Sequence, residues 1–467
     1  MSGPPEGVSP ADVIILGAGP AGAAYRAARA GHRVTLLERA GTPGGAAGSF
    51  ELAGVRVDHG SHRLHRSIDP AILAELRGLL GGDLQRRRRN GRILLAGRWI
   101  AFPLRPLDLI LRLPPGLALG AMRDAALAPA RRRPEGDDFA AALRAGIGPT
   151  ITERFYLPFA RKLWGLEPSE LAAEQARRRV SADSPAKVLR RALGGDRTGR
   201  RSFLYPRRGY GQICERLVEA AVAAGARVRY GTAAARVVLG AEGVRVTLSD
   251  GSEVAGRRLW STIPLPALAR MAEPEPGPEA LAAADRLEFR ALLLVYLVLD
   301  GGRYTPFDAH YLPEPFTPVT RVSEPANYRD GDDPPDRTVL CAEIPCSDGD
   351  DLFRAGDAEL AGLVVQSLAR AGLPAARPRE VAVHRLAQAY PVYRRGFDGP
   401  LAALEGWAER QPALLTSGRL GLFVHDNAHH ALAMAWAAAD ALRPDGGFDG
   451  AAWADARRRF AAHVVED

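Results

Sequence analysis

The chain has 467 residues, of which 46% are hydrophobic and 25% charged, and its formal net charge is +8. This length leaves room for two or three domains with an ample core. The positive charge falls in short arginine runs without interleaved aromatic residues, which argues against a nucleic-acid-binding protein. The three cysteines show neither a Cys-x-x-Cys pair nor metal-ligand spacing, so we interpret them as buried thiols of a reducing cytoplasm.

We expect neither a signal peptide nor a membrane-spanning helix. Residues 1–10 are polar and rich in Pro and Gly, without the basic start and apolar centre of a signal peptide. No stretch reaches the roughly 18 uncharged apolar residues that a spanning helix needs. We therefore predict a cytoplasmic protein with no transmembrane segment.

Arginine runs raise the question of an anionic partner. We interpret each run as a solvated helix face, but an anionic substrate or peripheral contact with an anionic membrane surface stays open. The runs are Arg86–Arg89, Arg131–Arg133, Arg177–Arg179 and Arg457–Arg459.

The first elements of the chain predict a dinucleotide site. Residues 13–16 indicate a strand buried on both faces, a helix follows over 21–30, and a second strand over 33–37 ends on Glu38. Between strand and helix, Gly17, Gly19 and Gly22 satisfy the Gly-x-Gly-x-x-Gly pattern.

Each residue of this pattern has a separate expected role. Gly17 permits the tight turn, Gly19 lets a pyrophosphate approach the backbone, and Gly22 lets the helix pack close to the strand. The helix N-terminus at Pro20 and Ala21 offers N–H groups to the phosphates. Glu38 would accept hydrogen bonds from the ribose hydroxyls and disfavours a 2′-phosphate.

Three later segments extend the pattern. A glycine pair follows the second strand in "TPGGAAGSF" (42–50), and an Asp-x-Gly-x-His loop lies within "GVRVDHGSHRLH" (54–65). Near the end of the chain, "ALLTSGRLGLFVHDNAHHALAMAWAAADAL" (413–442) predicts a short strand, a Gly-Arg turn and a long Ala-rich helix.

In this order the motifs resemble those of the FAD superfamily that includes protoporphyrinogen oxidase, phytoene desaturase, amine oxidase and UDP-galactopyranose mutase. "SGRLG" (417–421) is similar to the mutase pattern. The resemblance implies an α/β fold with a Rossmann-like FAD-binding domain built from residues 10–90, 202–264 and 386–465. It further implies a helical insertion or substrate lid (91–201) and a sheet-based substrate domain (265–385).

The resemblance also assigns residues to FAD. Many members carry Arg after the glycine pair, where this chain has Ala46, and Arg39 is the candidate to supply that charge. The helix N-terminus near residue 428 would stabilise negative charge on the reduced flavin. The residues implied are Gly17, Gly19, Pro20, Ala21, Gly22, Glu38, Arg39, Gly44, Gly45, Ser49, Gly60, Ser61, His62, Val237, Gly418, Arg419, Asn427, Ala428, His429 and His430.

The spacing of apolar residues predicts the helices and strands between the FAD segments. We expect a helix over 70–80, a hairpin over 91–102 and helices from there to about 201. In the helical stretch we interpret Phe155 and Phe159 as core and leave Trp164 and Arg161 open. Strands are predicted over 227–230, 235–239, 244–248, 253–259, 291–300 and 337–346, with a helix near 357–372.

No other catalytic motif competes. The sequence has no Gly-x-Ser-x-Gly elbow, Walker loop or His-Glu-x-x-His helix. Histidines cluster at 59, 62 and 65 and at 425, 429 and 430, with spacings that could suit metal ligands. Because both clusters fall on segments assigned to the flavin, we predict no metal site.

The predicted function is that of an FAD-dependent oxidoreductase of the oxidase, dehydrogenase or desaturase type. It would take a hydride from a substrate C–H or C–N bond, with His62, Tyr390 and Tyr393 as candidate catalytic residues. The alternative is a flavin-dependent mutase acting on a nucleotide sugar or another glycosyl substrate. A non-catalytic carrier of the same fold is disfavoured by the intact glycines and Glu38. The substrate, a small anionic or apolar molecule, and the oligomeric state stay open.

Overall fold

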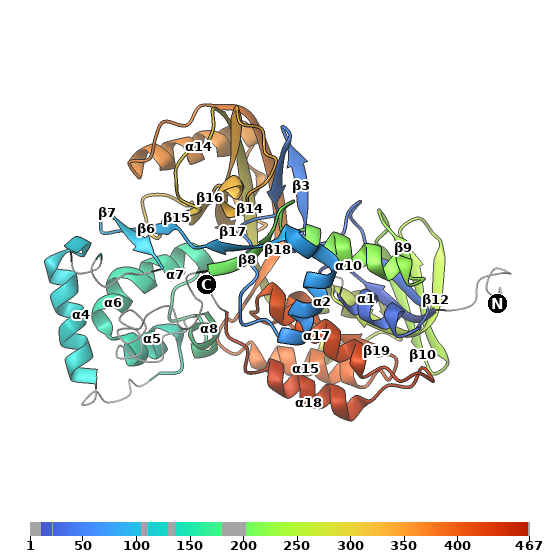
Figure 1. The fold of residues 1–467 in the computed structure, drawn as a ribbon. Helices are drawn as coiled ribbons and strands as arrows, with labels where there is room; N and C mark the ends of the chain where they lie inside the picture. The colour runs from blue at the N-terminus through green and yellow to red at the C-terminus, as the bar shows by residue number, and fades with distance from the viewer. Residues whose placement is uncertain are drawn as a thin grey trace.

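A computed structural model describes residues 11–20, 22–103, 108, 111–128, 136–179 and 202–465. Ala21 and the run Arg131–Arg133 lie outside these residues, as does the end of the predicted helical insertion (180–201). Figure 1 shows three regions: a sheet with helices at the right, a second sheet at the top, and a group of helices at the left.

The first sheet is built around the N-terminal strand. Its order is β13-β10-β11-β12-β1-β2-β9, with β19 paired to β12. Strand β1 runs parallel to β12 and β2, whereas β10, β11 and β12 are antiparallel. The strands are β1 (Ala11–Leu16), β2 (Val34–Leu37), β9 (Arg227–Arg229), β10 (Ala234–Gly240), β11 (Gly243–Leu248), β12 (Glu253–Ser261), β13 (Ala272–Glu273) and β19 (Leu414–Thr416).

Both faces of this sheet are covered by helices. In β1, Val13 and Ile15 pack into one apolar cluster, and Ile14 and Leu16 into the other, which confirms the strand predicted to be buried on both faces. The first cluster includes α1 (Gly22–Arg29), α2 (Pro70–Leu80), α10 (Gln212–Ala223) and α17 (Ala428–Asp440). The second includes α11 (Leu265–Met271), α12 (Pro278–Arg286) and α15 (Asp398–Glu409).

The second sheet has the order β18-β14-β17-β16-β15-β6-β7. One face packs against α14 (Asp357–Arg370). The other face, including Leu294 and Tyr296, packs against Val55 and Val57 of the first region. The strands are β6 (Gly91–Leu95), β7 (Arg98–Phe102), β14 (Glu288–Asp300), β15 (Ala309–Tyr311), β16 (Arg321–Ser323), β17 (Arg337–Cys346) and β18 (Pro378–Val392).

Two predicted domain boundaries differ from this arrangement. The hairpin β6–β7, which we placed in the helical insertion, belongs to the second sheet because β6 pairs in parallel with β15 through Arg92 and His310. Strand β18 runs through the predicted boundary at 385/386 and pairs with β14 along most of its length. Long-range pairing determines both boundaries, and local sequence gives no sign of it.

The helical region contains α4 (Pro115–Leu127), α5 (Phe139–Ile147), α6 (Pro149–Ile151), the π-helical turn η4 (Thr152–Tyr156), α7 (Leu157–Trp164) and α8 (Ala173–Arg179). Helix α7 turns Leu157, Ala160 and Trp164 into an apolar core, a spacing typical of one helix face. The interpretation of Phe155 and Phe159 as core is wrong. They are half-buried and stack on each other with ring centroids 6.0 Å apart.

Short elements complete the chain. The hairpin β3 (Ser49–Leu52) and β4 (Val55–Asp58) follows the 3-10 turn η1 (Gly45–Ala47), and β5 (Leu84–Arg88) pairs with β8 (Ser202–Pro206). The others are η2 (Gly81–Asp83), η5 (Pro325–Tyr328), α13 (Asp351–Arg354), α16 (Gly418–Gly421) and α18 (Gly450–Phe460). In the described part of the chain, no helix is both long and apolar enough to cross a bilayer.

Candidate flavin site

Two glycine loops meet at the end of β1. Gly44 N–H donates to the Ala18 carbonyl at 2.7 Å, and a Cβ on Gly45 would lie 3.9 Å from Gly19 Cα. A Cβ on Gly19 itself would meet nothing within 4 Å. The backbone at Gly19 is therefore open to a ligand, as a pyrophosphate site requires.

The other two glycines of the motif face protein atoms. Gly17 has φ +90°, and a Cβ there would lie 2.4 Å from Thr262 Oγ1. A Cβ on Gly22 would lie 2.2 Å from Trp436 Cζ3 in α17. Gly22 thus allows α1 to pack on the C-terminal helix, whereas we predicted that it serves packing on the strand.

Glu38 lies at the end of β2, where its carboxylate holds the glycine loop. One oxygen accepts from Ala18 N at 2.7 Å and the other from Ala40 N at 2.8 Å. Each oxygen keeps a further lone pair for a ribose hydroxyl. Arg39, the next residue, is exposed.

Val237 does not fit its predicted role beside the adenine. It is buried within β10, where it pairs with Val246 on one side and Ala272 on the other, so its backbone groups are engaged in the sheet. The segment beside Glu38 is instead 229–232: Glu38 N donates to the Arg229 carbonyl, and Thr232 N donates to the Glu38 carbonyl.

Ser49 is a structural residue rather than a free cofactor ligand. Its hydroxyl donates to Asp58 Oδ1 at 2.6 Å and accepts from Gly211 N at 2.7 Å. The buried Asp58 also accepts from Tyr210 N at 2.9 Å and from the Tyr205 hydroxyl. This network ties the β3–β4 hairpin to the start of α10, and both Ser49 and Asp58 are fully buried.

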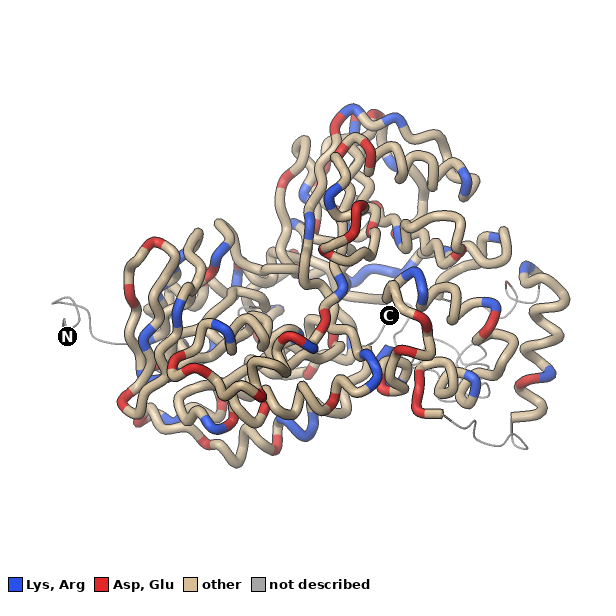
Figure 2. Tube along the Cα trace, turned by 180° about the vertical axis from the view of Figure 1, so that it is seen from behind, with Lys and Arg blue, Asp and Glu red and all other residues tan. Residues whose placement is uncertain are grey.

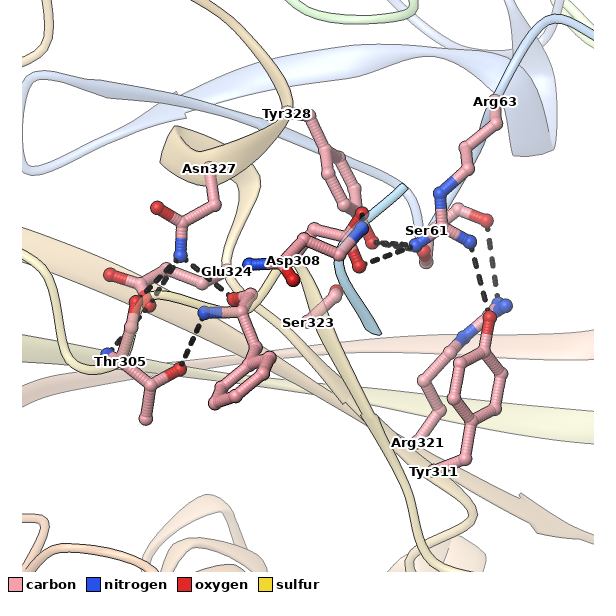
Figure 3. Close-up of polar contacts among 12 residues, drawn as sticks. Ser61, Arg63, Thr305, Asp308, Tyr311, Arg321, Ser323, Glu324, Asn327 and Tyr328 are labelled. Atoms are coloured by element: carbon pink, nitrogen blue, oxygen red, sulfur yellow. Dashed lines mark hydrogen bonds and ion pairs between the residues drawn. The ribbon is translucent and has the colours of Figure 1, made fainter. Parts of the chain in front are cut away.

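The loop from Gly60 to Arg63 is anchored to the second sheet. Ser61 N donates to Glu343 Oε1 at 2.9 Å, and Arg321 binds the same carboxylate at 2.7 Å while donating to the Ser61 carbonyl at 3.3 Å. Arg63 donates to Asp308 Oδ1 at 3.2 Å and to the Tyr311 hydroxyl at 3.1 Å, as Figure 3 shows. The Arg63–Asp308 ion pair and the hydrogen bond from Ser61 to Glu343 thus join this loop to the second sheet, within which Arg321 pairs with Glu343.

The sequence predictions omitted these four charged residues. Glu343 interrupts the otherwise apolar core of β17 and is buried, a pattern that marks a paired carboxylate. That signal was present in the sequence, but its partner Ser61 lies 282 positions away. The arginine run Arg86–Arg89 was also misread as a helix face, because residues 86–88 form β5 and Arg89 is buried.

His62 is held as a neutral imidazole. Its Nε2 lies 3.0 Å from the His59 carbonyl, so Nε2–H donates and Nδ1 keeps its lone pair. Burial lowers the pKa of His62, although Asp58 and Glu343 act in the opposite direction. A neutral imidazole can serve as an acceptor for a proton that a substrate releases.

Tyr390 contacts one aromatic and two arginine side chains. Its ring makes an edge contact with Trp164, with centroids 6.4 Å apart. The Arg179 and Arg419 guanidinium carbons lie 5.0 and 5.4 Å from its centre.

Tyr393 does not join this site. It is buried, its hydroxyl donates to the Phe423 carbonyl at 3.1 Å, and its ring stacks on Phe397 at 4.1 Å. We therefore withdraw Tyr393 as a catalytic candidate. Arg161, left open by the sequence, pairs with Glu167 at 2.9 Å on the surface.

The C-terminal segment contains a third ion pair. Arg419 donates to the Asp426 carbonyl at 2.5 Å, and its Nε lies 3.6 Å from Asp426 Oδ1. Burial raises the pKa of Asp426 to about 6. Gly418 opens α16, and Asn427 caps α17 in a capping box with His430.

The histidines of the two clusters point to different neighbours. His429, which follows Ala428 in the first turn of α17, lies 3.2 Å from the Ser67 hydroxyl. His430 stacks on His463 at 4.0 Å, and His425 contacts Gln175 at 3.1 Å. Within the residues that the structure describes, no group of three or more His, Cys, Asp or Glu side chains could hold a metal ion.

Fold and site together define a flavoprotein. A Gly-x-Gly-x-x-Gly loop open at Gly19, an acidic residue closing β2 and a C-terminal helix entering the same region fit the dinucleotide FAD. The chain belongs to the flavin containing amine oxidoreductase family, whose model matches residues 22–442. Its cofactor is FAD, as the resemblance predicted. A comparison with curated proteins gives no match.

Solved structures share the fold. Reduced UDP-galactopyranose mutase superposes with a TM-score of 0.80 at 21% identity, covering 97% of this chain and 99% of that one. A candidate protoporphyrinogen oxidase from Exiguobacterium sp. 255-15 gives 0.71 at 21% identity, with 93% and 99% covered. Cyclohexylamine oxidase from Brevibacterium oxydans IH-35A gives 0.64 at 18% identity, with 92% and 99% covered. The predicted α/β fold class is confirmed.

Proposed function

We propose that this protein is an FAD-dependent oxidoreductase that takes a hydride from a substrate C–H or C–N bond. The observation that carries the proposal is the position of the His62 loop between two regions. His59 lies 2.9 Å from the Gly45 carbonyl of the glycine loop, and Ser61 and Arg321 share the Glu343 carboxylate of the second sheet. FAD supplies the electron chemistry by accepting the hydride at N5. The protein supplies orientation and electrostatics.

The residues that would hold the cofactor come from three segments. Gly17, Gly19, Pro20, Gly22, Gly44 and Gly45 would surround the pyrophosphate, and Glu38 would bind the ribose. The loop Gly60, Ser61 and His62 and the segment with Gly418, Arg419 and residues 427–430 would lie near the ring. Ala21 stays in this set by its place in the motif. Ser49 supports the set only by positioning the β3–β4 hairpin.

The charges of the site favour a neutral reacting centre. Arg63, Arg321 and Arg419 are each matched by a carboxylate, from Asp308, Glu343 and Asp426 respectively. These three pairs carry no net charge, so they give an ammonium group little attraction. We therefore favour oxidation of a C–H bond, with His62 orienting the substrate or accepting a proton and Tyr390 beside it.

The second candidate is a mutase that uses reduced flavin without net oxidation. The overlap with UDP-galactopyranose mutase along nearly the whole chain favours it, and so does the segment "SGRLG" at 417–421. Against it stand Val424 and His425, where we would expect the Arg-Tyr pair that mutases use for substrate phosphate.

Anaerobic mixing separates the two. Oxidised protein is mixed with protoporphyrinogen, putrescine, cyclohexylamine and UDP-galactopyranose in turn, and the flavin absorbance is followed. In an oxidoreductase, the substrate lowers the visible absorbance of the flavin because two electrons stay on it until an acceptor is added. A sugar interconversion that appears only after dithionite reduction, with no acceptor consumed, would replace the leading proposal with the mutase.

The role of His62 has its own test on the same assay. His62→Ala should retain FAD and lower turnover by about a hundredfold, as expected for a lost acid-base group. Tyr393→Phe is the matched control, because its hydroxyl bonds only within the core, and it should leave turnover unchanged. Unchanged turnover in His62→Ala would assign this side chain to packing.

A further inference from the structure

The outer face of helix α4 is apolar, and its inner face carries a buried acid. Leu119, Met122 and Leu127 are 62%, 60% and 53% exposed. Asp124, on the inner side, is only 2% exposed and accepts from Thr150 N at 2.6 Å. Leu117 is the one large apolar side chain that α4 buries. Three of its four large apolar residues therefore face outward, whereas the usual surface helix turns its apolar stripe inward.

The exposed apolar side chains of the described residues concentrate here. Four of the six large hydrophobic residues that are exposed lie between 111 and 127, with Leu111 at 69%. Figure 1 places α4 at the outer edge of the helical region, away from the first sheet. Figure 2, from behind, shows the same helix at the right-hand edge with few charged segments.

Arginines border this apolar face. A hollow of about 490 Å³ lies beside α4 and is lined by Leu119, Arg123 and Arg154. The Arg123 side chain is 70% exposed. Glu153 also lines the hollow and is paired with Arg144 at 2.7 Å, and Arg123 lies 3.7 Å from the buried Asp124. Arg123, Arg144 and Arg154 therefore face two carboxylates, which leaves a net positive charge at the hollow. Arg112, with its side chain 58% exposed, lies before the helix and pairs with Asp108 at 2.7 Å.

Size and charge together select the partner. A helix face of about 13 residues is about 20 Å long and about 10 Å across, which is an area of roughly 200 Å². This area is far below the about 800 Å² that each partner contributes to a stable protein interface. Apolar side chains bordered by arginine match the acyl boundary and the phosphates of a lipid surface. We propose that the α4 face, defined by Leu111, Leu119, Met122 and Leu127 with Arg123 and Arg154, docks on an anionic lipid bilayer.

Vesicle flotation tests the proposal on the FAD-loaded full chain. Vesicles of phosphatidylcholine alone are compared with vesicles that hold about 30 mol% phosphatidylglycerol. The wild type should float with the anionic vesicles and much less with the neutral ones, and about 0.5 M NaCl should weaken binding. The triple variant Leu119→Glu, Met122→Glu, Leu127→Glu should lower the partition coefficient at least about tenfold.

A matched control comes from α10. Val222 is 50% exposed on a different region, so Val222→Glu should bind as the wild type does, whereas Leu119→Glu should bind less. Melting temperature and FAD content verify that each variant is folded. Equal binding by wild type and triple variant, no binding by the wild type, or no preference for anionic vesicles overturns the proposal. A wild-type dimer that the triple variant converts to monomers would assign the face to a second copy instead.

Discussion

Gly17 and Gly19 stand two positions apart in one motif, yet their surroundings differ completely. At Gly17 the positive φ and the Thr262 hydroxyl leave no space for a side chain. At Gly19 no protein atom would meet a side chain, so a bound ligand is the reason that this position needs glycine. The motif therefore combines a residue needed for folding with one needed for the cofactor.

This difference gives a prediction for FAD binding. Gly19→Val should leave the apoprotein folded, with an unchanged melting temperature, but should weaken FAD binding by about a hundredfold or more because the side chain blocks the pyrophosphate. The visible flavin absorbance of the purified protein measures its FAD content, and titration of the apoprotein with FAD measures the affinity. Gly17→Val is the contrast and should lower the melting temperature itself. Full FAD content in Gly19→Val would contradict the assigned phosphate site.

Local sequence identified the glycine loop and the strand that ends before Glu38, and it missed the partners of the His62 loop across the fold. Glycine spacing and the strand ending on Glu38 are short-range features, so one stretch of chain suffices to identify them. Glu343 reaches Ser61, and Arg63 reaches Asp308, over separations of 282 and 245 residues. Nothing local fixes which buried charge meets which, because strand order in the second sheet decides it.

At the scale of elements, helix α1 is held between the first sheet and two other helices. Gly22 brings α1 against Trp436 of α17, and the Trp436 indole N–H donates to Glu75 of α2 at 3.1 Å. The last glycine of the nucleotide motif is thereby coupled to the C-terminal segment that carries Arg419 and Asn427. Packing at Gly22 therefore joins the two segments that we assign to FAD.

A double-mutant cycle tests this coupling. Gly22→Ala places a methyl group where the Trp436 ring lies and should cost roughly 1–3 kcal/mol of unfolding free energy. Trp436→Phe opens space but loses the bond to Glu75, so it too should destabilise. In the double variant the two costs should be less than additive by about 1 kcal/mol. Urea unfolding of all four proteins measures the cycle, and strict additivity would mean that the two residues are not in contact.

Periodicity predicted many elements closely and the domain boundaries less well. The helix over 70–80 and the strand over 337–346 are confirmed with the same bounds, because their patterns are long and regular. The hairpin β6–β7 was correctly found but assigned to the wrong region, since its parallel partner β15 lies more than 200 residues later. Tertiary pairing of this kind leaves no local mark in a sequence.

For the whole molecule, one buried lysine joins the helical region to the second sheet. Lys162 of α7 donates to the carbonyl of Leu312 and, at 3.1 Å, to that of Glu314, just after β15. Burial lowers the pKa of Lys162 to about 7 from 10.5. The same side chain thus fixes two regions together and carries a desolvation cost whenever it is charged.

The sign of the pH dependence follows from the direction of this shift. The folded protein disfavours the charged lysine, so the cost is complete below about pH 7 and disappears as the pH rises toward 10.5, the value for an unperturbed lysine. In that window the unfolded chain binds more protons than the folded one. The contribution of Lys162 to the free energy of unfolding therefore rises with pH by up to about 1.4 kcal/mol per unit.

Comparison with Lys162→Met isolates this contribution from those of all other groups. The difference in unfolding free energy, wild type minus variant, should rise steadily between about pH 7.5 and 9.5 and reach about 2 to 3 kcal/mol across that range. Urea unfolding at several pH values measures it. Arg161→Met, beside it on the surface and paired with Glu167, should give a difference that stays constant with pH. A constant difference for Lys162→Met as well would mean that this lysine remains fully charged and solvated, and that it does not link the two regions as described.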